Sequence, residues 1–308
     1  RPRRAPRRAP PQPGLVERVA ALLGDQAEAG VRLAWRAALA PLSAARAPGE
    51  ALAGARRTLR GLRGMLDDLR HPAVPDPLAV PGSGLSRRLD VAELSLARLR
   101  AIKAAFDVTL NDLVLAALAG AIGAYHRERR VHADSLACLV PMNLRGSGER
   151  ASLGNRVGMF RIALPVGERD PRRRLERIVE QTRAAKADRR GAAAPLLVEA
   201  LALVPGPAMR WIAHRALGRV NVACTNVPGV AEPRSVAGVP IESIFPFASV
   251  VEGTPLVVAL LSYAGRMEVG IDTDPEAIPD PHRITDLFEA ALAEYEKLGA
   301  PGAGSVGA

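Results

Sequence analysis

Cysteine, lysine and aromatic residues are all scarce in this sequence of 308 residues. The two cysteines, Cys138 and Cys224, lie inside apolar runs, which excludes a disulfide scaffold and predicts two buried, reduced thiols in a reducing compartment. Arginine supplies nearly all of the 42 basic residues. Together with abundant alanine, this composition is typical of a GC-rich genome, so the net charge of +10 says little about partners.

A signal peptide and a membrane-spanning helix are also missing. The first ten residues are Arg, Pro and Ala, where a signal peptide needs an apolar segment, and the sequence does not begin with Met. No charge-free and proline-free apolar run approaches the length of about 18 residues that a spanning helix requires. The nearest candidate, residues 191–209, is broken by three prolines. We therefore expect no spanning helix, and we expect a fragment or a product whose true start lies upstream.

The sequence lacks the motifs of several enzyme classes. It has no Gly-x-Ser-x-Gly hydrolase elbow and no Gly-x-x-x-x-Gly-Lys phosphate loop. No two histidines have metal-ligand spacing, and no cysteine or carboxylate cluster accompanies them. We interpret all five as surface or helix-end residues and predict neither a metal site nor a cofactor.

What is present is a linker, a helical segment and an α+β domain. Residues 1–13 form an Arg/Pro linker without the interleaved aromatic residues that favour nucleic-acid binding. Residues 14–85 form a helical connector that ends in a proline-rich stretch, and residues 299–308 form a flexible tail. Between them, residues 86–298 alternate between strand and helix patterns, which predicts a mixed sheet flanked by helices.

The expected elements of this domain follow from periodicity and from turn residues. Helices are predicted at residues 94–106, 110–125, 171–187 and 281–298, and strands at residues 87–91, 135–142, 156–165, 220–225, 235–239, 244–250, 256–264 and 266–272.

Asn111 and Asp112 stand where an apolar helix begins. The first N–H groups of a helix have no partner within it, so Asn111 is interpreted first as a cap. The alternative is that its amide faces a cavity and donates to an oxyanion or to a substrate carbonyl.

Two further polar clusters follow strand ends. Asn143 and Arg145 begin a loop, and Asn155 and Arg156 close it. In the other cluster, Asn226 precedes a turn in which Gly229 permits close approach of the backbone. The alternative for both clusters is that these residues only end a strand and begin a loop.

In this order, the motifs resemble the C-terminal half of the bacterial wax ester synthase/diacylglycerol acyltransferases, abbreviated WS/DGAT. The matching segments are NDLVLAALAGAI, PMNLRGSGERASLGNRVGMFRIALP, TNVPGVAEP and FPFASVVEGTPLVVALLSYAGRMEVGIDTD. The resemblance implies a chloramphenicol-acetyltransferase-like architecture, with a substrate tunnel between two α/β domains. It also implies acyl transfer from acyl-CoA, as substrate, to a diacylglycerol or a long-chain alcohol, in a cytoplasmic protein associated peripherally with membranes or lipid bodies.

This sequence departs from the family in one respect. The catalytic His-His-x-x-x-Asp-Gly motif of the family belongs to the N-terminal domain, and no His-His pair occurs here. The implied partner is therefore an N-terminal acyltransferase domain that supplies the base, and we expect this chain alone to be inactive. A condensation-type acyltransferase with another acceptor and a non-catalytic partner subunit remain the alternatives.

The resemblance also assigns candidate roles to individual residues. Asn111 becomes an oxyanion donor, with Asp112 orienting the start of the helix. The remaining candidates are substrate contacts: Asn143, Arg145, Asn155, Arg156, Asn226 and Gly229. Arg145 and Arg156 are either ligands of CoA phosphates or solvated loop residues.

Overall fold

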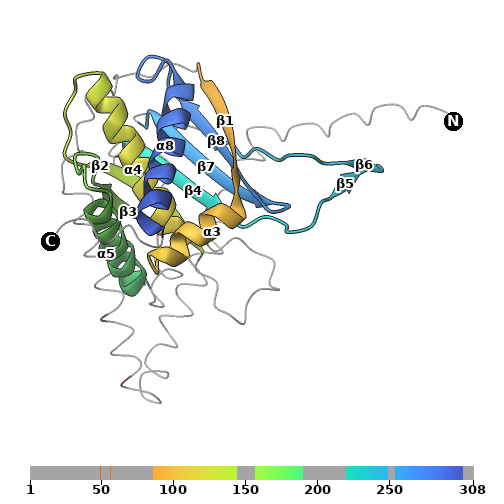
Figure 1. Cartoon of the computed structure of the whole chain (residues 1–308), viewed down its shortest axis with the longest axis horizontal. Coiled ribbons are helices and arrows are strands. Elements are labelled where there is room, and N and C mark those ends of the chain that lie inside the picture. The colour runs from red at the N-terminus through yellow and green to blue at the C-terminus, as the bar shows by residue number, and fades with distance from the viewer. Residues whose placement is uncertain are drawn as a thin grey trace, which may run out of the picture. The chain divides into compact units, whose positions relative to one another are not determined.

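The computed structural model describes residues 86–143, 157–189, 220–248 and 254–300, together with Gly49 and Arg56 (Figure 1). The chain divides into two compact units, and the elements below belong to the unit made of residues 64–190 and 211–308. The predicted linker, the helical connector with its proline-rich end except for Gly49 and Arg56, residues 191–209, and residues 301–308 of the C-terminal tail lie outside the described residues.

A six-stranded mixed sheet forms the centre of this unit, in the order β1-β8-β7-β4-β2-β3. The pairs β2–β4 and β4–β7 are parallel, whereas β1–β8, β7–β8 and β2–β3 are antiparallel. The predicted mixed sheet is therefore confirmed. Its strands are β1 (Arg88–Ser95), β2 (Leu136–Asn143), β3 (Val157–Leu164), β4 (Val222–Val227), β7 (Leu256–Tyr263) and β8 (Arg266–Thr273).

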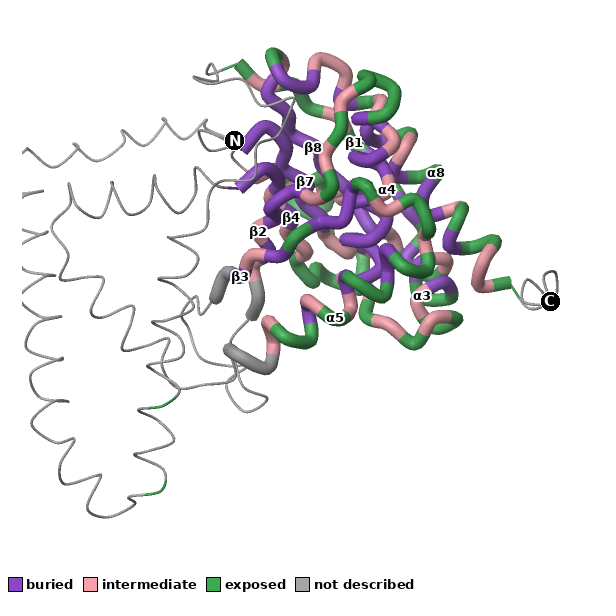
Figure 2. The backbone as a smooth tube through the Cα atoms, turned by 90° about the vertical axis from the view of Figure 1, so that its left-hand side faces the viewer, coloured by how far each residue is buried: buried purple, intermediate pink, exposed green. Residues whose placement is uncertain are grey.

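Four helices cover one face of the sheet (Figure 1): α3 (Leu96–Ala105), α4 (Leu110–Glu128), α5 (Pro171–Arg189) and α8 (Pro281–Gly299). Buried positions are concentrated along β7, β8 and α4 (Figure 2). Most of α4 is buried because its sequence is apolar on nearly every side, as expected for a helix in the middle of a layer. One core cluster joins this helix to the alternate residues of the strands that face it.

A hairpin of two short strands extends away from the sheet (Figure 1). It corrects the prediction of one strand at residues 235–239, because Ala237 and Gly238 have φ of +52° and +85° and form a tight turn between β5 (Ser235–Val236) and β6 (Val239–Pro240). The strand predicted at 244–250 is also wrong over its described part, residues 244–248, which contain no strand. Pro246 cannot donate to a ladder, and its carbonyl oxygen lies against the backbone of Gly270 in β8 instead.

Candidate active site

The described candidate residues lie at one end of the sheet. Asn143 is the last residue of β2 and Asn226 the penultimate residue of β4, and these strands are parallel, so both face the same edge. Residues 129–135 lead from the end of α4 directly into β2, which brings the first turn of α4, with Asn111, to the same end. The fold thus gathers three of the predicted clusters that are 32 to 115 residues apart in sequence.

The first turn of α4 is held by a capping box. Thr109 is the N-cap: its Oγ1 accepts a hydrogen bond from the N–H of Asp112 at 3.2 Å, and the Asp112 carboxylate accepts one from the N–H of Thr109 at 3.1 Å. Asn111 is therefore not the cap, because the N-cap is Thr109 and the helix begins two residues earlier than the cap interpretation required. The Thr-x-x-Asp pattern was present in the sequence and could have indicated this start.

Asp112 also connects α4 to α5. Its side chain is buried, and its Oδ1 accepts a hydrogen bond from the Thr182 hydroxyl at 2.6 Å. Its Oδ2, which already accepts from the Thr109 N–H, also accepts a hydrogen bond from the Thr109 hydroxyl at 2.6 Å. A buried carboxylate held by hydroxyl and N–H donors is rigid, so Asp112 fixes the start of α4 relative to α5. Nothing in the sequence indicated Thr182.

Asn111 is half-buried beside this network. Its side chain makes no hydrogen bond with the part of the chain that the structure describes. An amide placed at the N-terminal end of a helix, where N–H groups and the helix dipole favour negative charge, suits a developing oxyanion. The geometry is therefore compatible with the donor role and gives Asn111 no competing structural role among these residues.

The end of β4 is fixed against β7. Asn226 is half-buried and in register with Leu260, on the same face as Cys224, which packs in the core toward the helices. The N–H of Gly229 donates to the Ser262 hydroxyl at 3.0 Å. A Cβ on Gly229 would come within 1.9 Å of the Ser262 carbonyl oxygen, so the predicted close approach of the backbone is present, and it is made to β7.

The loop after β2 falls largely outside the described residues. Asn143 pairs with Val157 at the start of β3, so the loop leaves and re-enters the sheet at the edge that carries Asn226. Arg145, Asn155 and Arg156 belong to this loop and lie outside the described residues.

A cavity of about 260 Å³ lies next to the α3–α4 junction. Its apolar wall includes Phe106, Val108 and Leu175, and Arg172 and Arg183 of α5 line it as well. By contrast, Leu113 and Leu115 are completely buried in the core cluster. Their side chains pack within the protein core.

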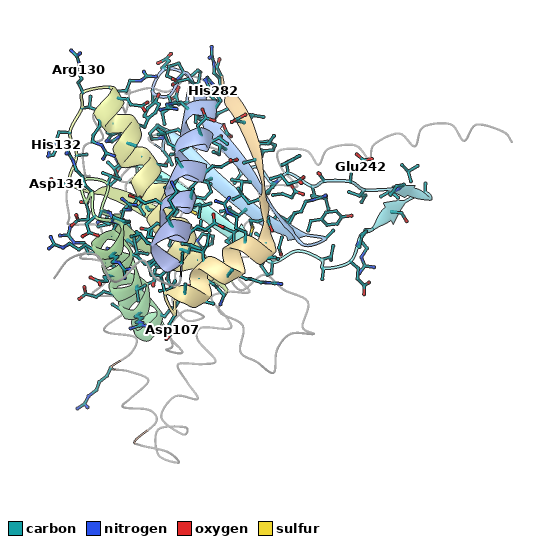
Figure 3. All side chains as sticks on the ribbon, in the orientation of Figure 1. Asp107, Arg130, His132, Asp134, Glu242 and His282 are labelled. Carbon is teal, nitrogen blue, oxygen red and sulfur yellow. The ribbon has the colours of Figure 1, made fainter. Side chains whose placement is uncertain are left out.

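The described histidines lie away from this end. His132 and His282 are exposed and sit toward the end of the molecule opposite Asp107, which marks the α3–α4 junction (Figure 3). The His132 Nε2 lies 3.3 Å from the Asp134 carboxylate, but both side chains are almost fully exposed. His126 is buried on α4, fifteen residues beyond Asn111, which is about 22 Å along the helix axis. His71 and His214 lie outside the described residues. None of the described histidines is placed to act with Asn111.

The two cysteines also lack the properties of nucleophiles. Both are free and fully buried, as the sequence predicted. Burial raises the pKa of Cys224 to about 12 and raises the pKa of Cys138 well above its usual range. A thiol with so high a pKa carries almost no thiolate at neutral pH. Neither cysteine therefore serves the candidate site as a nucleophile.

Residues 153–296 match the family model of the WS/DGAT C-terminal domain. The resemblance to the C-terminal half of the WS/DGAT family, expected from the sequence, is confirmed. Over 260 residues it is 30% identical to a probable diacylglycerol O-acyltransferase of Mycobacterium tuberculosis, covering 82% of this chain and 56% of that protein. It is 28% identical over 224 residues to the O-acyltransferase WSD of Acinetobacter baylyi, covering 69% and 48% of the two chains. This chain spans about half the length of the curated relatives it matches.

Solved structures support the same fold. The wax ester synthase/diacylglycerol acyltransferase of Marinobacter aquaeolei superposes with a TM-score of 0.57 at 23% identity, over 77% of this chain and 56% of that one. The epimerization domain of tyrocidine synthetase B superposes with a TM-score of 0.51 at 11% identity, over 74% and 52% of the two chains. The chloramphenicol-acetyltransferase-like fold class expected from the sequence is confirmed.

Proposed function

We propose that this chain is the C-terminal part of an acyl-CoA-dependent O-acyltransferase that makes triacylglycerols, wax esters or both. The observation that carries the proposal is that the first turn of α4, with Asn111, lies at the same end of the sheet as the ends of β2 and β4, in a chain whose residues 153–296 match the WS/DGAT C-terminal domain. Relatives named O-acyltransferase and diacylglycerol O-acyltransferase support this class of reaction. The acceptor is a diacylglycerol or a long-chain alcohol, acyl-CoA is the donor, and no cofactor takes part.

In the proposed reaction, a histidine from an N-terminal domain outside this sequence removes the proton of the acceptor alcohol. The alcohol oxygen forms a bond to the thioester carbonyl carbon, whose oxygen becomes an oxyanion. Asn111 donates a hydrogen bond to that oxyanion, and Asp112 positions the helix turn that carries the donor. The carbon–sulfur bond then breaks, and the CoA thiolate takes the proton from the histidine. A well-placed oxyanion donor lowers the barrier by about 3 kcal/mol.

The substitution Asn111→Asp tests this role in the longer protein that contains the histidine. The variant keeps the shape of the side chain, and negative charge in the first turn of a helix is favourable, so its melting temperature should change little. A carboxylate cannot donate and repels the oxyanion, so the rate should fall about 100-fold. The capping box does not involve the Asn111 side chain, so near-normal turnover would refute the donor role without any ambiguity about helix capping.

A second experiment tests the source of the base. The 308-residue chain alone should release no thiol from palmitoyl-CoA in the presence of hexadecanol or diacylglycerol. Adding the N-terminal domain in trans should restore release. Turnover by the chain alone at ordinary enzyme rates, about 1 per second or faster, would place the base within this sequence.

We also propose a cytoplasmic location with peripheral attachment to membranes or lipid bodies. Among the described helices, none is long and apolar enough to cross a bilayer by itself; α3 and α4 satisfy that criterion only as a pair, and they meet at an angle of 93°. Arginines near an anionic surface contribute about 1 kcal/mol each, an attraction that salt screens. Flotation with anionic liposomes should therefore be lost at high salt, and flotation that survives high salt would argue for insertion instead.

A further inference from the structure

A second cavity, of about 300 Å³, opens on the helical layer between α4, α8 and the start of α5. Three arginines and one glutamate line it: Arg127, Arg169, Arg174 and Glu294. The rest of its wall is apolar or small, as at Gly120 and Ala124. The lining residues on α4, Gly120, Ala124 and Arg127, lie nine to sixteen residues beyond Asn111. None of the described candidate residues lines the cavity.

Arg174 is the fixed cation of this cavity. Its side chain is only 4% exposed, and its Nη2 donates to the Glu294 carboxylate at 3.0 Å. Its Nε donates to the carbonyl oxygen of Ala116 at 3.0 Å and to the Tyr295 hydroxyl at 3.2 Å, while its Nη1 donates to the carbonyl oxygen of Glu168 at 3.3 Å. The buried guanidinium is therefore held in one orientation by α4, α8 and the loop before α5.

Arg127 and Arg169 lie beside this fixed charge on the wall of the cavity. Among the described residues, neither side chain makes an ion pair or a hydrogen bond. Partial burial, followed by the nearby charges of Arg169 and Arg174, lowers the pKa of Arg127. With one glutamate facing three arginines, the cavity has an excess of two positive charges.

Two glycines of α4 make this convergence possible. A Cβ on Gly120 would lie 2.8 Å from the Arg174 guanidinium, and a Cβ on Gly123 would lie 2.1 Å from the carbonyl oxygen of Val166. Glycine inside a helix costs about 1 kcal/mol relative to alanine. Because neither residue has a Cβ, neighbouring groups can pack directly against α4. The Arg174 guanidinium packs against Gly120, and the loop that carries Arg169 packs against Gly123 through the Val166 carbonyl group.

We propose that this cavity binds a phosphate monoester. A phosphate monoester carries a charge of about −1.5 to −2 at neutral pH, which matches the excess of two positive charges. Guanidinium groups are suited to phosphate oxygens, because they donate paired and directed hydrogen bonds. The volume lies at the lower end of that of small-ligand sites, about 300 to 1,000 Å³, so the cavity fits a small headgroup. The site does not depend on the proposed acyl transfer.

Calorimetric titration of the whole chain with glycerol 3-phosphate tests the proposal. We expect saturable binding of one equivalent, and Arg127→Gln and Arg169→Gln should each raise Kd about tenfold or more, because each removes a charge-assisted hydrogen bond. Arg130→Gln is the matched control, since Arg130 projects into solvent just beyond α4 and does not line the cavity (Figure 3). It makes the same change in net charge and should leave Kd unchanged.

Vesicle sedimentation distinguishes a lipid headgroup from a free phosphate compound. Phosphatidylcholine vesicles containing phosphatidate present a monoester, whereas vesicles of matched surface charge containing phosphatidylglycerol present a diester. Selective loss of phosphatidate binding in Arg127→Gln and Arg169→Gln supports a lipid ligand. Saturable glycerol 3-phosphate binding without that loss supports a soluble one. Absence of saturable binding, or equal weakening by Arg130→Gln, overturns the proposal and leaves only general attraction between charges.

Discussion

The hydrogen bond between Asp112 and Thr182 should determine how firmly the start of α4 is held. Thr182→Val keeps the shape of the side chain and removes one hydrogen bond to a buried carboxylate, and such a bond contributes about 2 kcal/mol. Asp112→Ala removes that bond and half of the capping box, whose loss costs about 1 kcal/mol more. The expected losses are therefore about 2 and about 3 kcal/mol in the free energy of unfolding.

The double variant isolates the bond itself. Because Asp112→Ala already removes the acceptor, adding Thr182→Val should cost almost nothing further. The double variant should lose about 3 kcal/mol, where independent effects would give about 5, so the coupling energy is about 2 kcal/mol. In Asp112→Ala, the Thr182 hydroxyl can still donate to the carbonyl oxygen of Val179, at 3.2 Å. This alternative acceptor limits the free-energy cost of leaving the hydroxyl without the carboxylate.

Urea denaturation followed by circular dichroism measures these losses as shifts of the midpoint at constant slope. Asp107→Asn is the control: Asp107 precedes the same helix but is exposed, and its loss of charge should change stability by less than about 0.5 kcal/mol. Additive effects of the two single substitutions would refute the reasoning, since they would mean that the two side chains do not interact.

Two other predictions concern the sheet. The Glu268 side chain is fully buried on β8, and burial raises the pKa of its carboxyl, so the folded state favours the protonated form. Stability should therefore fall as pH rises from about 4.3 through the raised pKa, and a pH series of melting curves should show that Glu268→Gln lacks this fall and is more stable at neutral pH. Gly229→Ala should cost about 3 kcal/mol, because its Cβ would collide with the backbone of Ser262. In the same melting assay, Gly238→Ala should cost only about 1 kcal/mol, since its Cβ meets open space and only the positive φ is unfavourable; equal losses would contradict the collision.

Much of the fold could be predicted from local patterns. The apolar α4 and the turn at Ala264 and Gly265, with φ of +47° and +84°, both lie where the sequence indicated them. Such signals are local, because helical periodicity and turn residues depend on neighbours a few positions away. The errors were local too: the hairpin at residues 235–240 was interpreted as one strand because the Ala-Gly turn was overlooked within it.

The amino-acid sequence by itself determined the family resemblance and the polar residue types at the ends of the elements, such as Asn111 at the start of α4 and Asn226 near the end of β4. Only the tertiary structure decided which residues meet. Asp112 accepts a hydrogen bond from Thr182, which is 70 residues away in the sequence. Arg174 donates a hydrogen bond to Glu294, which is 120 residues away in the sequence. These contacts depend on how α4 packs between α5 and α8, and no periodicity in the chain encodes that packing. The same packing, through two glycines that admit their neighbours, brings three arginines from separate elements to one cavity.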